Sequence, residues 1–385
     1  MSRESTTVTY LLTPKVESIE RAADLLLAEM TSGMQYISTR KGVEMYKCED
    51  RLPYIDGSVK GEILSIQKKE NNSFLVKLSF PVTNLDPDLG GISNLWAMVA
   101  GEVFSLYFIE RAKFLELELP PSFKNHYEGP QFGIDGIREL LQVKDRPLMG
   151  AIIKPNLGLN PEKTAKVVSI LAKAGFDFAK DDEICVNPDI CPLEERVKLV
   201  RETLDKIQER SGKKMLYMAD VTSDFATLGK AAEMAISAGA GGLMLDPFSI
   251  GLSSIDYLRK NFSCPIYVHR VGYGLFCSGS LSISYEIFTE LFRMLGADFS
   301  HVGGIWGKSQ EAKYKVSEYV DILRKPSSIK ATWPVVSGIS LENMAEYYHF
   351  YGDETLFLDH IDIYKDEQSS ARKLRALKQE MGLAN

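Results

Sequence analysis

Eight short apolar runs, separated by roughly 20 to 40 residues, are the feature of this sequence that most restricts its fold. Longer amphipathic patterns that are typical of helices, such as residues 161–174 and 192–211, lie between them. This alternation is typical of βα units, and eight units predict a parallel (β/α)8 barrel, the TIM barrel. The eight runs are residues 148–154, 176–180, 215–220, 242–246, 265–269, 299–303, 334–337 and 356–359.

A smaller domain is predicted before the barrel, because 385 residues exceed what a barrel alone needs. The β-rich runs and helical patterns of this part are residues 7–12, 16–30, 74–80 and 91–104. They predict an α+β domain of ferredoxin-like type with an antiparallel sheet at residues 1–128, followed by the barrel at 129–385. The polar stretch 67–73 is predicted to be a solvated hairpin loop between two strands.

Charge, cysteine content and hydropathy exclude several classes of protein. The net charge of −7 without a long basic run argues against nucleic acid as a partner, although a local cationic pocket can still bind phosphate. The five cysteines are odd in number and lack CxxC spacing, which argues against a disulfide framework or a zinc ribbon. Residues 1–8 lack the apolar core of a signal peptide, and no stretch approaches ~18 uninterrupted apolar residues. We expect a cytoplasmic protein with no membrane partner.

Nearly every predicted strand ends in a polar residue. Barrel active sites form at the carboxyl ends of the strands, so these side chains would meet in one place. One polar strand end is most often structural, whereas a near-complete ring of them favours an active site. The ring consists of Lys154, Lys180 with the acidic residues after it, Asp220, Asp246, His269 with Arg270, His301, Ser337, and Asp359 with His360.

The second strand carries the best candidate for metal binding. Asp182 and Glu183 are adjacent, and Lys180 would share a face with Asp182 if the strand continues. Two carboxylates alone make a weak site, but a few hard oxygen ligands suit Mg2+. An unmodified lysine would repel the metal, so Lys180 must be neutral or modified. The alternative is a structural, ion-paired cluster of these three side chains.

The segment Gly175-Phe-Asp-Phe-Ala-Lys-Asp-Asp-Glu183 resembles the activation segment of the RuBisCO large-subunit superfamily. In that family, CO2 carbamylates the lysine, which then binds Mg2+ together with the aspartate and the glutamate. The resemblance implies that Lys180, as a carbamate, binds the metal with Asp182 and Glu183. It implies Mg2+ and CO2 as cofactors.

Further motifs resemble the same family in the same order along the barrel. Gly150-Ala-Ile-Ile-Lys-Pro-Asn-Leu-Gly-Leu159 resembles its first strand, and Val268-His-Arg270 resembles the His-Arg pair of the fifth. His301-Val-Gly-Gly-Ile-Trp-Gly-Lys308 resembles the sixth strand with its mobile loop, and Ser337-Gly338 matches the seventh strand. The implied catalytic residues are Lys154, which handles protons next to the substrate, Lys180, His269, and Lys308 at the loop tip.

Two motifs before the barrel resemble parts of the family's shared active site. Ser93-Asn-Leu-Trp-Ala-Met-Val-Ala-Gly101 resembles the helix that carries the active-site asparagine, here Asn94. Glu29-Met-Thr-Ser-Gly33 resembles the acidic segment that reaches into a partner subunit's site. The resemblance therefore implies a homodimer in which Glu29 and Asn94 complete the neighbour's site.

The implied chemistry is the formation of an enolate. Mg2+ would polarise a substrate carbonyl and stabilise the developing negative charge. The base would be either the free carbamate oxygen or Lys154, the latter if its surroundings leave it neutral. A guanidinium, an imidazole and a hydroxyl together make a plausible phosphate grip. The implied substrate-binding residues are Glu29, Asn94, Arg270, His301, Ser337 and Gly338.

Four departures from the carboxylase pattern cluster around the substrate. Ile152 replaces a threonine, Asn156 replaces a second lysine, and Ser337-Gly-Ile339 has one glycine where the family usually has two. The eighth strand reads Leu358-Asp-His-Ile-Asp362 instead of a glycine triplet. Such a triplet binds a phosphate through its backbone N–H groups, and an aspartate there would repel one.

These departures make a bisphosphate substrate doubtful, although the grip of Arg270, His301 and Ser337 is retained. They favour a RuBisCO-like protein of form IV type that forms an enolate from a phosphorylated keto sugar or related metabolite, as an enolase or isomerase such as those of methionine salvage. One alternative is a decarboxylase or hydrolase of a phosphorylated oxo-sugar acid. Others are a true ribulose bisphosphate carboxylase, which Lys308 supports, and a barrel that binds a metabolite without turning it over.

Overall fold

The computed structural model describes residues 4–16, 18–307, 310–359 and 366–383. The chain forms two compact units, one of residues 1–127 with 272–288 and one of residues 128–271 with 289–385. Residues 272–288, which we expected in the barrel, belong to the first unit because strand β12 (Leu281–Ile283) pairs with strand β6 (Ile109–Glu118). No helix in the described part of the chain combines the length and the apolar composition that a membrane span requires.

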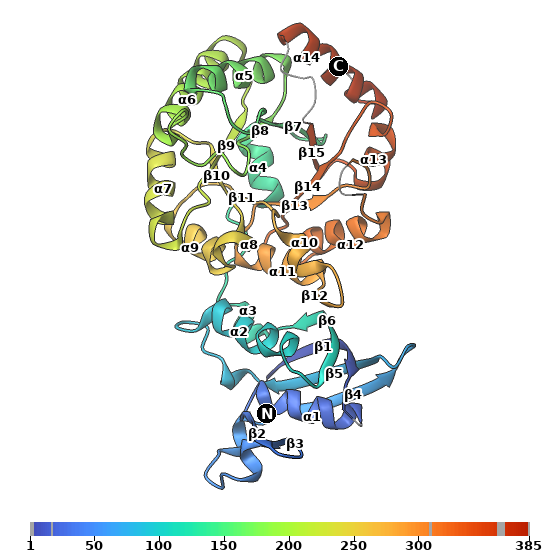
Figure 1. Cartoon of the computed structure of the whole chain (residues 1–385). Helices are drawn as coiled ribbons and strands as arrows, with labels where there is room; N and C mark the ends of the chain where they lie inside the picture. Colours follow the sequence, from blue (N-terminus) through green and yellow to red (C-terminus); the bar gives the residue numbers. More distant parts are fainter. Residues whose placement is uncertain (1–3, 17, 308–309, 360–365, 384–385) are drawn as a thin grey trace. The chain divides into compact units, whose positions relative to one another are not determined.

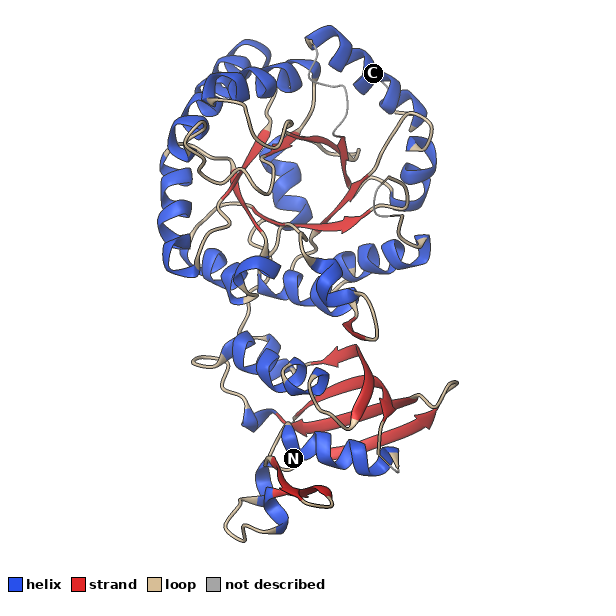
Figure 2. Cartoon of the chain, in the orientation of Figure 1, coloured by secondary structure: helices blue, strands red, loops and turns tan. Residues whose placement is uncertain are grey.

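The second unit is a closed barrel of eight parallel strands, which confirms the predicted fold (Figures 1 and 2). Each strand of the barrel pairs in parallel with both of its neighbours, in the spatial order β10-β11-β13-β14-β15-β7-β8-β9. The strands are β7 (Leu148–Ile152), β8 (Phe178–Lys180), β9 (Leu216–Asp220), β10 (Gly242–Leu245), β11 (Ile266–Val268), β13 (Phe299–Gly303), β14 (Trp333–Ser337) and β15 (Leu356–Asp359).

Helices surround this barrel, as Figure 2 shows. They are α5 (Pro161–Ala174), α6 (Leu193–Ser211), α7 (Phe225–Ser237), α8 (Pro247–Ile250), α9 (Ser253–Asn261), α11 (Tyr285–Leu295), α12 (Lys313–Arg324), α13 (Met344–Tyr351) and α14 (Glu367–Glu380). Helix α5 shows how the sequence sets their limits. The Asn160 side chain accepts a hydrogen bond from the backbone N–H of Lys163 (3.0 Å), and Gly175 ends the helix at φ 100°. The turn at Gly175 leads the chain into β8 and thus to Lys180.

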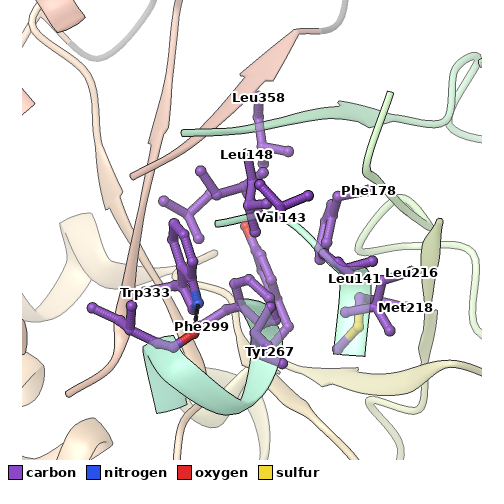
Figure 3. Packing of buried hydrophobic residues seen from close by; sticks show 14 of the residues in the cluster. Leu141, Val143, Leu148, Phe178, Leu216, Met218, Tyr267, Phe299, Trp333 and Leu358 are labelled. Carbon is purple, nitrogen blue, oxygen red and sulfur yellow. Dashed lines mark hydrogen bonds between the residues drawn. The ribbon is translucent and has the colours of Figure 1, made fainter. Parts of the chain in front are cut away.

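Large apolar side chains fill the barrel at the beginnings of its strands (Figure 3). Helix α4 (Gly133–Leu141) closes that end, because its Ile134, Ile137 and Leu141 belong to the same buried cluster. The indole N–H of Trp333 donates to the backbone oxygen of Ile134 (3.3 Å), drawn as a dashed line in Figure 3. Side chains therefore fill the amino-terminal end of the barrel. We expect an active site at the carboxyl end of the strands.

The period of two along each strand decides which side chains enter the barrel. Leu356 and Leu358 of β15 lie in the barrel core, so Asp359 points outward to the helix layer. There it forms an ion pair with Lys373 of α14 at 2.7 Å. Conversely, Phe178 lies in the core, and Lys180 follows it on the same inward face.

The first unit contains a five-stranded sheet in the order β12-β6-β1-β5-β4, and its α+β class is confirmed. The pairs β1–β5, β1–β6 and β4–β5 are antiparallel, while β12 joins β6 in parallel. A loop at residues 69–73 connects β4 to β5 within the predicted stretch 67–73, whose first two residues belong to β4, and Asn71 and Asn72 have positive φ. The further elements of this unit are β1 (Ser5–Pro14), α1 (Ile19–Glu29), β2 (Met34–Thr39), β3 (Gly42–Lys47), β4 (Glu62–Lys68), β5 (Phe74–Pro81), α2 (Gly91–Ala100), α3 (Pro121–Lys124) and α10 (Tyr273–Cys277).

Candidate active site at the carboxyl end of the barrel

Six polar side chains face the inside of the barrel at the carboxyl ends of its strands. Each lies two positions after a side chain of the barrel core, as His269 does after Tyr267 and His301 after Phe299. The six are Lys180, Asp220, Asp246, His269, His301 and Ser337. All are buried except Ser337, which is half-buried. The ring of polar strand ends predicted from the sequence is therefore largely brought together.

Lys180 is the most deeply buried cation of this ring, with a relative exposure of 0%. Its ammonium group donates to the backbone oxygen of Asp181 (2.9 Å) and lies 3.8 Å from Oε2 of Glu183. Burial lowers the pKa of Lys180, although the nearby carboxylates act in the opposite direction. A lysine in this environment gives up its proton more readily than an exposed one.

Asp182 is paired with Lys154, which follows β7. The Lys154 ammonium group donates to Oδ2 of Asp182 and to Oδ1 of Asn156 (3.0 Å). In the unmodified chain, each carboxylate of the expected metal set is therefore close to a lysine, Asp182 to Lys154 and Glu183 to Lys180. Asn156, one of the departures from the carboxylase pattern, directly contacts the lysine that is predicted to handle protons.

Asp181 has a structural role, because its carboxylate turns away from the ring. It accepts hydrogen bonds from the hydroxyl of Tyr217 (2.6 Å) and from the backbone N–H of Asp220 (3.1 Å). It also forms an ion pair with the fully buried Arg196 of α6 at 3.0 Å. This network fixes the backbone between Lys180 and Asp182, which positions the candidate metal ligands on either side of it.

Asp220 and Asp246 belong to the site although the residue-type reasoning gave them no role. Thr222 donates from its backbone N–H and its hydroxyl to Oδ1 of Asp220, and the buried Oδ2 has no hydrogen-bond partner among the described residues. Burial raises the pKa of Asp220 to about 8 and that of Asp246 to about 7. The sequence placed both residues at strand ends. Only the structure shows that both side chains point into the barrel and therefore belong to the candidate site.

His269 lies between two carboxylates. Its Nε2 is 4.0 Å from Oε2 of Glu183, and its Nδ1 is 3.9 Å from Oδ2 of Asp246. The imidazole rings of His269 and His301 have centroids 5.3 Å apart. The two histidines predicted for catalysis and phosphate binding are thus neighbours.

Arg270 is buried and forms an ion pair with Glu311, a residue that the sequence reasoning missed. The glutamate lies 41 positions further along the chain, in the segment after β13, and nothing in the local sequence marks it. Its backbone N–H donates to the oxygen of Gly304 (3.1 Å). The expected phosphate-binding arginine therefore already has an anionic partner.

Ser337 and Gly338 are held beside the segment that follows β13. The Tyr347 hydroxyl of α13 donates to the backbone oxygen of Ser337 (3.1 Å) and accepts from the N–H groups of Ile305 (2.9 Å) and Trp306 (3.3 Å). A Cβ atom added to Gly338 would lie 2.5 Å from the Trp306 oxygen, so only glycine fits there. Tyr347 is a further positioning residue that the sequence did not reveal.

Two expected site residues belong to the first unit, and a third is not among the described residues. Glu29 ends α1 of the first unit, where its side chain accepts from the backbone N–H of Met34 (3.2 Å), and Asn94 is exposed on α2 of the same unit. Their predicted role in a partner's site stays a prediction. Lys308 lies outside the described residues, as do His360, Ile361 and Asp362 of the eighth-strand departure.

One step of the sequence reasoning is wrong. We expected Asp359 to repel a phosphate at the barrel mouth, but its side chain points to the helix layer and is ion-paired with Lys373. The strand register explains the error, because the inward positions of β15 are those of Leu356 and Leu358.

The donor set fits a magnesium ion only if Lys180 is modified. Among the described residues, no three His, Cys, Asp or Glu side chains are grouped so that they could hold a metal ion. This agrees with an expected set that contains only two carboxylates, those of Asp182 and Glu183. A carbamate on the buried Lys180 would add the third hard oxygen ligand. Mg2+ and the carbamate stay predictions for this chain.

Two family models match the sequence and together cover most of it. Residues 133–359 match the family described as ribulose bisphosphate carboxylase large chain, catalytic domain. Residues 4–123 match the corresponding N-terminal domain. The two matches are centred on the barrel and on the sheet of the first unit.

Similar proteins include both enzymes with other reactions and carboxylases. The 3-oxo-isoapionate-4-phosphate transcarboxylase/hydrolase of Xanthobacter autotrophicus is 37% identical over 243 residues, which are 63% of this chain and 58% of that protein. The chain thus spans less than two thirds of the length of that relative. Octameric RuBisCO from Pyrococcus horikoshii matches with a TM-score of 0.88 at 25% identity, covering 100% of this chain and 90% of that one. Dimeric archaeal RuBisCO from Hyperthermus butylicus matches with a TM-score of 0.86 at 25% identity, covering 100% and 92%.

Proposed function

Because the chain belongs to the ribulose bisphosphate carboxylase large-chain family, we propose that it is a Mg2+-dependent enzyme that forms an enolate from a phosphorylated keto sugar or a related metabolite. One observation carries the proposal. Lys180 is fully buried at the end of β8, with its ammonium group 3.8 Å from the Glu183 carboxylate. A lysine with only a structural role would not need to be buried at the centre of a ring of residues whose types are common in catalysis.

Asp182, Glu183 and a carbamate on Lys180 would hold Mg2+, which supplies Lewis-acid polarisation of a substrate carbonyl when it is bound. Only a neutral amine reacts with CO2, so the lowered pKa of Lys180 supports its carbamylation. The amine loses a proton in this reaction and gains a carboxylate. Carbamylation would also replace the positive charge of Lys180 with a negative one. Lys180 and Glu183 would then no longer attract each other, and both could bind the same cation.

Proton transfer falls to groups around the substrate carbonyl. Lys154 is paired with Asp182, and His269 lies between Glu183 and Asp246, so both are placed to transfer protons at the barrel mouth. The base that removes the substrate proton is Lys154 or the carbamate, and we keep both alternatives. The enolate is stabilised by the cationic charge next to it.

One phosphate would bind to Arg270, His301 and Ser337. The proposal of a substrate with a single phosphate rests on Ile152 and Asn156, since Asp359 does not face the mouth. Asn156 places a neutral amide where the carboxylase has a second lysine, and its Oδ1 accepts from Lys154. The name of the Xanthobacter relative, which specifies a single phosphate, supports this choice.

A second candidate reaction is decarboxylation or hydrolysis of a phosphorylated oxo-sugar acid. The 37% identity to the Xanthobacter transcarboxylase/hydrolase favours it. Both candidates share an enolate, which is reprotonated in an enolase or isomerase and arises by loss of a carboxyl group in a decarboxylase. The two candidate reactions can therefore be distinguished by how the enolate forms and what it becomes.

The test is a screen of monophosphorylated ketoses and oxo acids with Mg2+ and bicarbonate. Deuterium exchange next to the carbonyl indicates the enolase or isomerase, and release of CO2 or of a cleaved acid indicates the second candidate. We expect Lys180→Ala to lower the signal at least about a hundredfold, and Lys163→Ala, an exposed lysine of α5, to leave it unchanged. An unchanged Lys180→Ala activity would overturn the proposal and favour a metabolite-binding barrel, and labelled CO2 entering ribulose bisphosphate would identify a carboxylase.

We also propose a homodimer with shared sites. The dimeric Hyperthermus and octameric Pyrococcus structures support an oligomer. Mixing inactive Asn94→Ala with inactive Lys180→Ala after dissociation should restore activity, because one site of the mixed dimer would then be intact. Persistent inactivity of a mixture that sediments as a dimer would contradict sharing.

A further inference from the structure

The Arg270–Glu311 ion pair is built into the barrel mouth. Arg270 directly follows the His269 strand end, and Nη2 of its guanidinium donates to Oε1 of Glu311. The side chains of Arg270 and Glu311 are 4% and 14% exposed. A charge-assisted hydrogen bond in such a shielded place is stronger than one at the surface.

Gly303 shows that the backbone is shaped to receive this pair. It ends β13 at φ 91°, and a Cβ atom added to it would lie 2.7 Å from Oε1 of Glu311 and would overlap the Arg270 guanidinium. The pair therefore rests directly on the Gly303 backbone. A side chain at this position would expel one of the two partners.

The pair lies within the cluster that we propose to bind phosphate. Glu311 donates its backbone N–H to Gly304, and a Cβ atom on Gly304 would overlap the backbone oxygen of Ser337. His301 is two positions before Gly303 on β13. A phosphate that reached the Arg270 guanidinium would thus come close to the Glu311 carboxylate, and two anions in a dry site repel each other.

We propose that Glu311 is an internal competitor that occupies Arg270 until the phosphate of the substrate displaces it. This inference rests on the proposed phosphate grip. Glu311 then lowers the affinity of the site for every anion, so that only a ligand with further contacts in the barrel mouth displaces it. Glu311 is in this sense a specificity-determining residue, because anions with few other contacts in the barrel mouth, such as free phosphate, bind only weakly to the site.

The test measures the affinity of inorganic phosphate for the full chain. Thermal unfolding at increasing phosphate concentrations gives this affinity, because a ligand that binds the folded state raises the melting temperature. Glu311→Gln keeps the size and an acceptor oxygen but removes the charge, and we expect it to bind phosphate about tenfold more tightly or better. Glu311→Asp keeps the charge on a shorter side chain. Its phosphate affinity should lie between those of the wild type and Glu311→Gln.

The matched control is Glu318→Gln on α12, which also removes one negative charge but is paired with Lys315 (3.2 Å) instead of Arg270. It should leave phosphate affinity unchanged. Adding Arg270→Gln should abolish the gain of Glu311→Gln, because the two residues would act through one contact.

Three other outcomes overturn the inference in different ways. If Glu311→Gln weakens phosphate binding, Glu311 positions Arg270 and does not compete with the ligand. If affinity is unchanged while Arg270→Gln still weakens it, the inference fails and the phosphate grip stands. If phosphate binding does not depend on Arg270 in any variant, both the inference and the proposed grip fail, while the Lys180-dependent isotope exchange tests the enolate chemistry separately.

Discussion

The two sides of the barrel mouth differ in their balance of charge. The metal side, formed by Lys154, Lys180, Asp182, Glu183, Asp220 and Asp246, has four carboxyl groups for two lysines. The phosphate side, formed by Arg270, His301, Ser337 and Glu311, has one guanidinium and one carboxylate in direct contact. The metal side has more carboxyl groups than lysines, whereas the phosphate side pairs its guanidinium with a carboxylate of the same chain.

This difference predicts that the two sides can be disabled separately. The largest effect is expected for Asp182→Asn, which removes a proposed metal ligand. We expect Mg2+ affinity, measured by calorimetry in bicarbonate, to fall by about a hundredfold or more, since the loss of even a partner of a ligand costs about 10- to 100-fold. Phosphate affinity should not change. Asp256→Asn, at a partly buried aspartate of α9 paired with Lys260 (2.8 Å), is the control. Unchanged Mg2+ affinity would remove Asp182 from the metal site.

The reciprocal variant is Arg270→Gln on the phosphate side. Loss of a charged donor should weaken phosphate binding by about tenfold or more and leave Mg2+ affinity unchanged. Arg201→Gln, which removes an exposed guanidinium of α6, should affect neither ligand. If Arg270→Gln weakened the binding of Mg2+ and of phosphate equally, the two sides of the mouth would be one coupled site.

The buried carboxyl groups of the metal side also predict a dependence of stability on pH. The pKa of Asp220 is about 8 in the folded chain and about 3.9 in an unfolded one. Between these values the folded state binds more protons, so the contribution of Asp220 to stability falls as pH rises. The free energy of unfolding of Asp220→Asn should therefore rise relative to that of the wild type between pH 5 and pH 8, by roughly 1 kcal/mol per pH unit, as urea unfolding at the two pH values would measure. An equal difference at both pH values would contradict the raised pKa.

The sequence predicted the inward position of Lys180 better than the contacts of Arg270 and Ser337, for a physical reason. The alternation of side chains is a local property, so the run ending at Lys180 shows that this lysine enters the barrel together with Phe178. The eight apolar runs likewise predicted the barrel, since each is a strand with its own turn and helix.

Contacts between distant segments could not be predicted in this way. Glu311 meets Arg270 across 41 positions, and the contact depends on the backbone at Gly303. Tyr347 reaches Ser337 from a helix of the outer layer. The pairing of β12 with β6 joins segments from different parts of the chain, which is why residues 272–288 were assigned to the wrong unit.

Asp359 provides the smallest and most discriminating test, because it asks whether the eighth strand belongs to the phosphate side at all. Its carboxylate is buried and paired with Lys373 of α14 at 2.7 Å, so Asp359→Asn should lower the free energy of unfolding by about 1–2 kcal/mol. Lys373 is partly exposed and can turn to solvent, which limits the loss. Asp205→Asn, at an exposed pair on α6, should cost less. Phosphate affinity should stay unchanged; a gain would mean that the Asp359 charge reaches the mouth after all and that its repulsion selects against a second phosphate.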